Sequence, residues 1–122
     1  LLNFTQDQKS QAFEELSLWL NQFKSIDHLY GLGGNLRALM QVNDIKGPIN
    51  TNDFSRYVKE YLSIDSSVLI DEFKIPKDRI DIIPEALNLY SLIIKQLNAQ
   101  IIENTFWSIS DGLVKKILRD QL

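Results

Sequence analysis

The segment IDHLYGLGGN, residues 26–35, decides the fold of this 122-residue chain. Its first half combines apolar and aromatic residues and is ended by glycine, which predicts a short β-strand. Gly31, Gly33 and Gly34 then follow within four positions and predict a tight turn. Asn35 comes directly after them, and Asn is a favoured N-cap residue. We therefore predict a strand–turn–helix unit in which Asn35 caps a short helix.

Helical patterns lie on both sides of this unit. Thr5 and Gln8 have the spacing of a capping box, and apolar residues recur behind them at helical spacing, which predicts a long helix over residues 5–24. Pro84 is expected in the first turn of another long helix, where its missing N–H group is tolerated. Helices are predicted over about residues 52–62, 65–73, 79–97 and 111–122, and a second strand over about residues 100–106.

The order of these elements indicates an α/β fold. Two strands separated by long helical crossovers are most easily parallel. Two strands form a poor sheet by themselves, and the chain opens at Leu1 without an initiator Met. We therefore expect that neighbouring strands lie upstream in a longer protein. The unpaired edges of the two strands predict self-association, as in a homo-oligomer, or helical cover over those edges.

Composition narrows the function classes. With 44% hydrophobic and 24% charged residues, the chain can build a packed core. A net charge of −3 and the lack of a Lys/Arg cluster argue against binding of a nucleic-acid duplex. No apolar run approaches the roughly 18–20 residues that span a bilayer. The absence of cysteine excludes disulfides, and the lone His28 cannot form a His-rich metal site. A cytoplasmic location is the default.

The glycine turn has the local chemistry of an anion site. Glycine lets the backbone approach a ligand closely, and the first N–H groups of a helix favour anions. The turn lacks the Lys-Ser/Thr pair of a P-loop and the third glycine of a dinucleotide fingerprint, so a purely structural turn is the alternative. Arg37 lies in the first turn of the helix. It either contacts a phosphate or pairs with a carboxylate such as Asp81 or Asp111.

Other candidate residues also have a plain structural interpretation. Asp81 and Glu85 lie four apart and resemble a carboxylate pair, but acidic residues in a first helical turn usually complement the helix dipole. Ser110 and Asp111 precede the last predicted helix, where either is a good N-cap. The sequence contains no recognisable nucleophile elbow that would pair with His28 in a catalytic triad. His28 is therefore expected to pack or to face solvent.

Taken in order, these motifs resemble the exopolyphosphatase/guanosine-pentaphosphate phosphatase (Ppx/GppA) family. Residues 31–39 are similar to the family's G-T-G-G-T turn and the helix with an Arg that follows it. Residues 75–84 are similar to its R-A-D-V-I segment, and residues 109–114 to its L-R-E-G-L-L turn. Ser110 replaces the Arg of that last motif. Spacing and order agree from about residue 20 to the end of the chain.

The resemblance implies a partial actin-like, ribonuclease H-like lobe. Residues 1–122 would be a single C-terminal piece of that lobe, mostly helical with two short parallel strands. The implied reaction is release of terminal phosphate from polyphosphate or guanosine pentaphosphate. It would use Mg²⁺, whose ligands lie outside this chain, and a catalytic Glu in the missing N-terminal lobe.

Within that activity the chain would supply one wall of the cleft and be inactive alone. The residues expected to face the ligand or orient those that do are Gly31, Gly33, Gly34, Asn35, Arg37, Asp81, Ser110 and Asp111. None of them is expected to be the general base. The alternative is a non-catalytic sensor or scaffold domain with an actin-like fold, which the loss of Arg at Ser110 favours.

Overall fold

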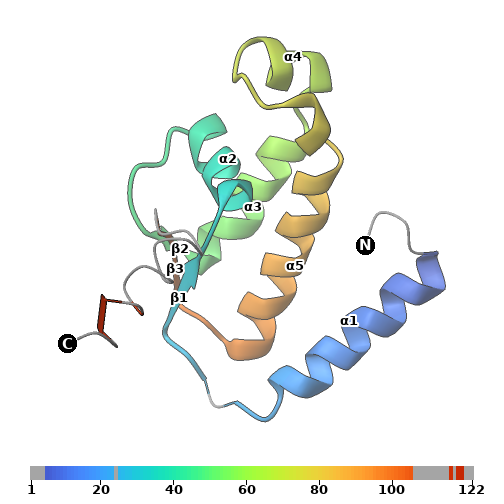
Figure 1. The fold of residues 1–122 in the computed structure, drawn as a ribbon, viewed down its shortest axis with the longest axis vertical. Coiled ribbons are helices and arrows are strands. Elements are labelled where there is room, and N and C mark those ends of the chain that lie inside the picture. Colours follow the sequence, from blue (N-terminus) through green and yellow to red (C-terminus); the bar gives the residue numbers. More distant parts are fainter. Residues whose placement is uncertain (1–4, 24, 106–115, 117, 120–122) are drawn as a thin grey trace.

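The computed structural model describes residues 5–23, 25–105, 116, 118 and 119. Helices dominate, and a small mixed sheet lies at one side of them (Figure 1). The described elements are, in chain order, α1 (Gln6–Leu20), β1 (His28–Gly31), α2 (Gly34–Val42), β2 (Ile49–Asn50), α3 (Thr51–Leu62), α4 (Ser66–Asp71), the 3-10 helix η1 (Lys77–Arg79), α5 (Ile82–Leu97) and β3 (Ile101–Asn104). None of the described helices is long and apolar enough to cross a membrane.

The sheet has the strand order β1-β3-β2. β1 and β3 are parallel, as predicted, with His28 opposite Ile101. The sheet also contains β2, a third strand that was not predicted. It pairs antiparallel with β3, which makes the sheet mixed and covers the second edge of β3. β2 has only two residues, which is too short for an alternating pattern to reveal it.

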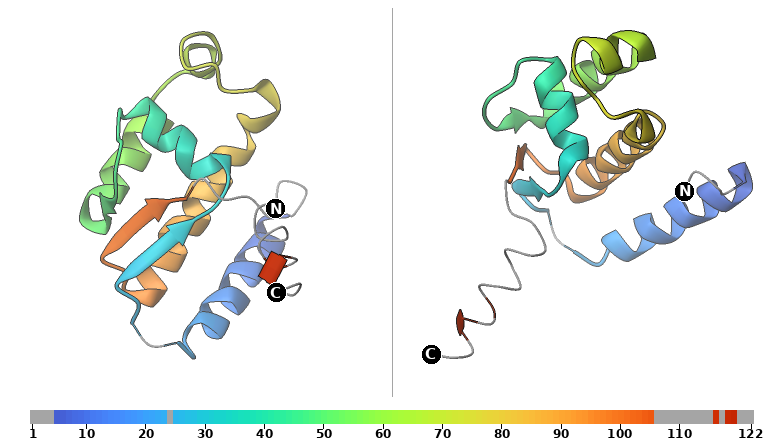
Figure 2. Two further views of the ribbon diagram at one scale, coloured as in Figure 1. Left: turned by 60° about the vertical axis from the view of Figure 1, so that its left-hand side comes forward. Right: turned by 45° about the horizontal axis from the view of Figure 1, so that its top comes forward.

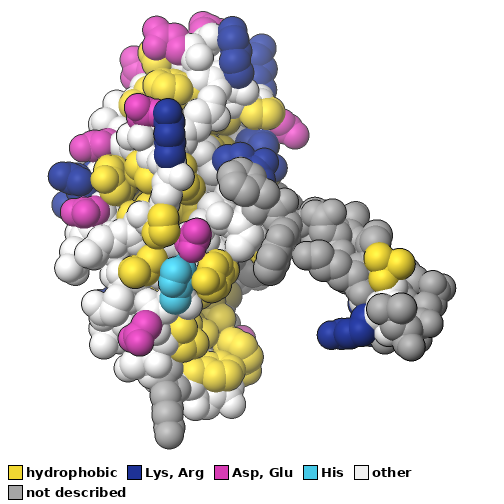
Figure 3. Space-filling view, turned by 90° about the vertical axis from the view of Figure 1, so that its left-hand side faces the viewer, with side chains coloured by type: hydrophobic (Ala, Val, Ile, Leu, Met, Phe, Trp, Pro, Cys, Tyr) yellow, Lys and Arg dark blue, Asp and Glu magenta, His cyan; other side chains and the backbone are white. Residues whose placement is uncertain are grey.

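The sheet has one buried and one outer face. Ile102 of β3 is fully buried in a core that includes residues of α2, α3 and α5. Figure 2 shows β1 and β3 side by side, with α5 along one face of them. Its neighbours Ile101 and Glu103 point to the opposite face, as the period-two alternation of a strand requires. On that outer face hydrophobic side chains surround the single histidine, His28 (Figure 3). His28 stacks on the exposed ring of Tyr30 with centroids 4.4 Å apart.

Helix α1 lies alongside α5, away from the sheet (Figure 1). Its predicted capping box is confirmed, because the Thr5 side chain accepts from the Gln8 backbone and the Gln8 side chain accepts from Thr5. Lys9 forms an ion pair with Glu85 of α5 at 2.8 Å. The helix ends at Leu20, four residues before the predicted end. This ion pair links α1 to α5.

Several predicted boundaries are corrected. The long helix expected from Arg79 is divided, because η1 ends at Arg79 and α5 begins at Ile82. Pro84 is the third residue of α5 and therefore lies in its first turn, as predicted. The second strand ends at Asn104. The predicted closing helix over residues 111–122 falls largely outside the described residues, of which 116, 118 and 119 are helical.

Candidate functional site

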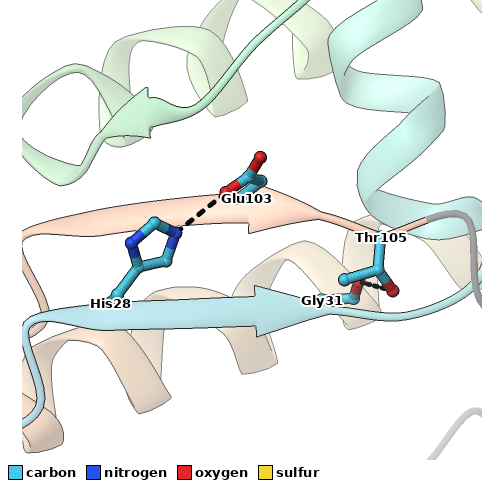
Figure 4. Close-up of polar contacts among 4 residues, drawn as sticks. All are labelled: His28, Gly31, Glu103 and Thr105. Carbon is cyan, nitrogen blue, oxygen red and sulfur yellow. Dashed lines mark hydrogen bonds and ion pairs between the residues drawn. The ribbon is translucent and has the colours of Figure 1, made fainter.

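The glycine turn lies at the carboxyl ends of the parallel strands. β1 and β3 end side by side, and the Gly31 carbonyl oxygen accepts two hydrogen bonds from Thr105, one from the backbone N–H at 2.8 Å and one from Oγ1 at 3.1 Å (Figure 4). Open α/β sheets bind ligands in the crevice beyond these strand ends. The fold therefore places residues 31–35 where a ligand site is expected.

Each glycine of the turn is needed for a different reason. A Cβ at Gly31 would lie 2.8 Å from the Tyr90 hydroxyl oxygen and 2.9 Å from Leu36 Cδ2. Gly33 has φ 88° and ψ −164°, a conformation that only glycine adopts readily, and nothing lies within 4 Å of a Cβ built there. At Gly34 a Cβ would lie 3.4 Å from an Arg79 guanidinium nitrogen. The turn is therefore packed on its inner side and open at Gly33.

Asn35 does not cap α2, which corrects the prediction. The N-cap residue is Gly33, which has no side chain to accept a hydrogen bond. The Asn35 side-chain oxygen instead accepts a hydrogen bond from the Arg79 guanidinium. This contact places a full positive charge over the first residue of α2, where the helix dipole is already positive. An anion between these groups would remove their mutual repulsion.

Arg79 belongs to a small pocket lined by cations. The pocket has a volume of about 170 Å³. Its cations are Arg37 of α2, Lys74 of the loop after α4, and Arg79 of η1. The described residues of the lining are Gly34, Arg37, Ala38, Gln41, Lys74, Ile75, Pro76, Arg79 and Ile83, and none of these is a carboxylate. In a chain of net charge −3, this gathering of positive charge favours an anionic ligand.

Among the described residues, Lys74 and Arg79 form no ion pair with a carboxylate. Sequence reasoning missed both as site residues and found only Arg37. Arg79 could have been found from the sequence, because it is the first residue of the stretch that is similar to R-A-D-V-I. Lys74 could not have been found in this way, because its position at the pocket depends on the path of the chain between α4 and η1.

Lys74 has an unusual backbone conformation for its residue type. Its φ of 59° lies in the left-handed region, a position that ends helices and is usually occupied by glycine. The strain costs about 1 kcal/mol. Strained residues that persist are often found at ligand sites.

We expect Lys74→Gly to raise the free energy of unfolding by about 1 kcal/mol, because glycine adopts this conformation without strain. The same change should weaken tripolyphosphate binding by about threefold to tenfold, because one cation of the pocket is lost. Urea unfolding and isothermal titration calorimetry measure the two effects. Asp44→Gly is the matched control, since Asp44 has φ 52° and lies outside the pocket lining. Unchanged affinity in Lys74→Gly would remove Lys74 from the site.

The structure does not gather all the predicted acidic residues. Asp81 is the exposed N-cap of α5 and makes no side-chain cap bond. Among the described residues it has no ion pair, so the alternative Arg37–Asp81 pair is absent there. Glu85 pairs with Lys9, so Asp81 and Glu85 do not act as a carboxylate pair. Ser110 and Asp111 lie outside the described residues.

His28 also lies away from the turn. It is the first residue of β1, and its Nε2 is 3.0 Å from a carboxylate oxygen of Glu103 on the neighbouring strand (Figure 4). Both side chains are about one-third exposed. The contact ties β1 to β3 on the outer face of the sheet, which agrees with the structural role expected for His28.

A second, largely apolar pocket has Asn35 in its lining. It has a volume of about 280 Å³. Its lining is Asn35, Ala86, Leu89, Tyr90 and Ile93. Burial raises the pKa of the Tyr90 hydroxyl, and a backbone hydrogen bond from Leu32 partly offsets this rise. Tyr90 therefore stays protonated.

The described residues do not form a metal site. They contain no group of three or more His, Cys, Asp or Glu side chains that could hold a metal ion. Mg²⁺ prefers carboxylate and other oxygen ligands, and the cation-lined pocket offers no carboxylate.

Comparison with known proteins identifies the fold. No protein-family model matches the chain, and no curated protein matches its sequence. Among solved structures it is similar to a Ppx/GppA family member from Aquifex aeolicus, with 17% identity and a TM-score of 0.67, over 97% of this chain and 43% of that chain. It is also similar to a type II variant of the Aquifex aeolicus Ppx/GppA phosphatase, with 16% identity and a TM-score of 0.66, over 90% of this chain and 41% of that chain.

These matches define the chain first as part of a lobe with an actin-like fold. More particularly, they confirm the resemblance to Ppx/GppA structures in three dimensions. The chain spans less than half the length of the solved structures that it matches. The activity of those longer proteins is therefore a proposal for this chain.

Proposed function

We propose that this chain is part of a phosphohydrolase that releases terminal phosphate from polyphosphate or guanosine pentaphosphate. It contributes one wall of the interlobe cleft and is inactive alone. The observation that carries this proposal is the cation-lined pocket at the start of α2, at the carboxyl ends of the parallel strands. The likeness to Ppx/GppA structures supports the same conclusion.

The residues of the pocket suit phosphate binding. Backbone N–H groups at the start of α2 point toward a bound anion, and the open side of Gly33 lets it approach. Arg37 and Arg79 present guanidinium groups, which match phosphate oxygens in pairs, and Lys74 adds a point charge. Phosphoryl transfer depends mainly on such positioning and charge neutralisation. The chain's part in the reaction is to hold the phosphate chain in place.

The remaining chemistry belongs to other parts of the parent protein. The described residues of the pocket include no carboxylate that could activate water. We assign the general base and any Mg²⁺ ligands to the missing lobe, which is then the chain's principal partner. We also place the parent protein in the cytoplasm, where phosphorylated nucleotides and polyphosphate are accessible to it.

A non-catalytic sensor or scaffold is the second candidate. A pocket that holds cations and no carboxylate is sufficient to bind an anion without acting on it. Phosphate release by the longer parent protein separates the two functions. Turnover that Arg79→Gln lowers supports the enzyme, whereas tight binding with no phosphate release supports the sensor.

We expect Arg79→Gln to weaken tripolyphosphate binding to the 122-residue chain by about tenfold or more, because hydrogen bonds to charged groups contribute roughly 1.5–3 kcal/mol. Isothermal titration calorimetry in Mg²⁺-free buffer measures this loss.

Arg56→Gln is the matched control for that experiment. Arg56 lies on α3, contacts Asp53 at 3.7 Å and is not part of the pocket lining. It makes the same change in net charge and should leave affinity within about twofold of wild type. Equal losses in both variants would show binding by overall charge alone, and the proposed site would be wrong.

A further inference from the structure

We infer that the closing segment of this chain, residues 111–122, packs as a helix across the outer face of the sheet. The outer face is formed by His28 and Tyr30 of β1 and by Ile101 and Glu103 of β3. The inference gives this face one occupant, which belongs to the same polypeptide. It does not depend on the proposed function.

The first observation is that the outer face is apolar and open. Tyr30 and Ile101 are exposed, and hydrophobic side chains surround His28 on this face (Figure 3). The opposite face of the same strands is covered by helices, and Ile102 is fully buried there. Parallel strands joined by helical crossovers usually have helices on both faces. The described residues therefore lack the layer that would cover the outer face.

The second observation is the place where the described chain leaves the sheet. Thr105 donates two hydrogen bonds to the Gly31 carbonyl oxygen, so the chain passes the carboxyl edge of the sheet at this residue. Residues 106–110 then lead to Asp111, a connection within the usual length of about 2–6 residues between a strand and a helix. Helices α2, α3 and α5 already pack on the inner face. The outer face is therefore the sheet surface that the closing segment can reach and cover.

The third observation is the pattern of the closing segment. Its apolar residues recur at helical spacing and share one half of a helix, and they are Leu113, Val114, Ile117, Leu118 and Leu122. Residues 116, 118 and 119 are helical in the structure. Leu118 is 56% exposed there, so the described residues do not bury it. The chain thus contains two apolar surfaces that lack a partner among the described residues.

The dimensions of the two surfaces agree. The four residues of β3 extend over about 13 Å, and residues 111–122 as a helix extend over about 18 Å. A helix that begins at the carboxyl edge and runs back along β3 therefore covers the strand. Leu118 would lie about 10 Å from Asp111 along the helix, and Ile101 lies about 10 Å from Asn104 along β3. The helix therefore places Leu118 opposite Ile101.

Charge favours the same arrangement. Glu103 supplies a carboxylate to the outer face, and its side chain is about one-third exposed. Cations outnumber carboxylates in the closing segment, and they are Lys115, Lys116 and Arg119. Long cationic side chains can extend from the edge of an apolar helix face to a carboxylate beside it. An exposed ion pair contributes little free energy, so the apolar contact holds the helix and the charges help to orient it.

A pair of introduced cysteines tests the contact, because the chain contains no cysteine of its own. Ile101→Cys combined with Leu118→Cys should form a disulfide within one chain on mild oxidation, because bridged Cα atoms must lie roughly 4.4–6.8 Å apart. Non-reducing electrophoresis and mass spectrometry of the 122-residue chain measure this bond. Leu18→Cys combined with Leu118→Cys is the matched control. Leu18 is 65% exposed on α1, away from the sheet, so this pair should stay reduced.

A double-mutant cycle tests the same contact without oxidation. Leu118→Ala should lower the urea midpoint of unfolding by about 0.5 M or more if Leu118 is packed, whereas an exposed leucine would contribute almost nothing. The losses caused by Leu118→Ala and Ile101→Ala should not add, because the two residues share one contact. The losses caused by Leu118→Ala and Leu18→Ala should add.

Three results would overturn the inference. A disulfide between two chains would show that a second copy covers the outer face. Equal oxidation of the two cysteine pairs, or oxidation of neither, would show that the closing segment does not pack on β3. Additive losses at Ile101 and Leu118 would show that these side chains do not touch.

Discussion

Gly31→Ala is expected to lower the free energy of unfolding by about 1–3 kcal/mol, the usual cost of overpacking. The added methyl group would lie 2.8 Å from the Tyr90 hydroxyl oxygen and 2.9 Å from Leu36 Cδ2. Leu36 is fully buried and Tyr90 packs against the core, so neither side chain can move aside without disturbing its neighbours. Urea unfolding followed by circular dichroism measures the loss.

Tyr90→Phe provides the control for Gly31→Ala. It removes the hydroxyl oxygen that the new methyl group meets first, but leaves the ring carbon Cε1 at 3.3 Å and Leu36 in place. We therefore expect a partial rescue, in which Gly31→Ala costs about 1 kcal/mol less in the Tyr90→Phe background. A loss below about 0.5 kcal/mol in the wild-type background would show that Gly31 is not tightly enclosed, and the packing described for the turn would be wrong.

Sequence reasoning predicted the central unit because its determinants are local. Residues 26–35 contain the strand, the glycines and the start of the helix within ten positions. The parallel pairing of β1 and β3 also followed, because parallel strands need a long crossover between them and the chain between these two is mostly helical. The capping box of α1 was predicted for the same reason, since its two partners are three residues apart.

The site was predicted only in part because its contacts are long-range. Asn35 has the sequence signal of an N-cap, yet Arg79, 44 residues away, takes its side-chain oxygen. The pocket also depends on Lys74, and no local sequence pattern predicts the left-handed backbone conformation of this residue. β2 was missed because two residues carry no periodicity, although its pairing covers an edge of β3. Ser110 and Asp111 lie outside the described residues, so their expected roles remain predictions.

The glycines of the turn affect both the packing of the core and the arrangement of the proposed site. Gly31 lets the Tyr90 hydroxyl pack against the turn, and Gly34 lets Arg79 lie over the start of α2. Both contacts come from the segment formed by η1 and α5, which packs against α2 on the same side of the sheet. The same glycines that close the core therefore place Arg79 and Tyr90 beside the two pockets.

Gly33→Ala should lower the free energy of unfolding by about 1–3 kcal/mol through the backbone alone. Its φ of 88° and ψ of −164° are unfavourable for any residue with a Cβ, while the space around it is open. The strained turn should also change the direction of the first N–H groups of α2. We therefore expect tripolyphosphate affinity to fall by about fivefold or more, even under conditions where the variant remains folded.

Gly47→Ala separates the backbone effect from the general effect of replacing glycine. Nothing lies within 4 Å of a Cβ built at Gly47, as at Gly33, but Gly47 does not have a positive φ. Its replacement should change stability by less than about 0.5 kcal/mol and leave anion binding unchanged. If Gly33→Ala behaved in the same way, the turn would tolerate a different backbone path. The N–H groups at the start of α2 would then not be held in one arrangement, and the anion site would have to depend on the three cationic side chains alone.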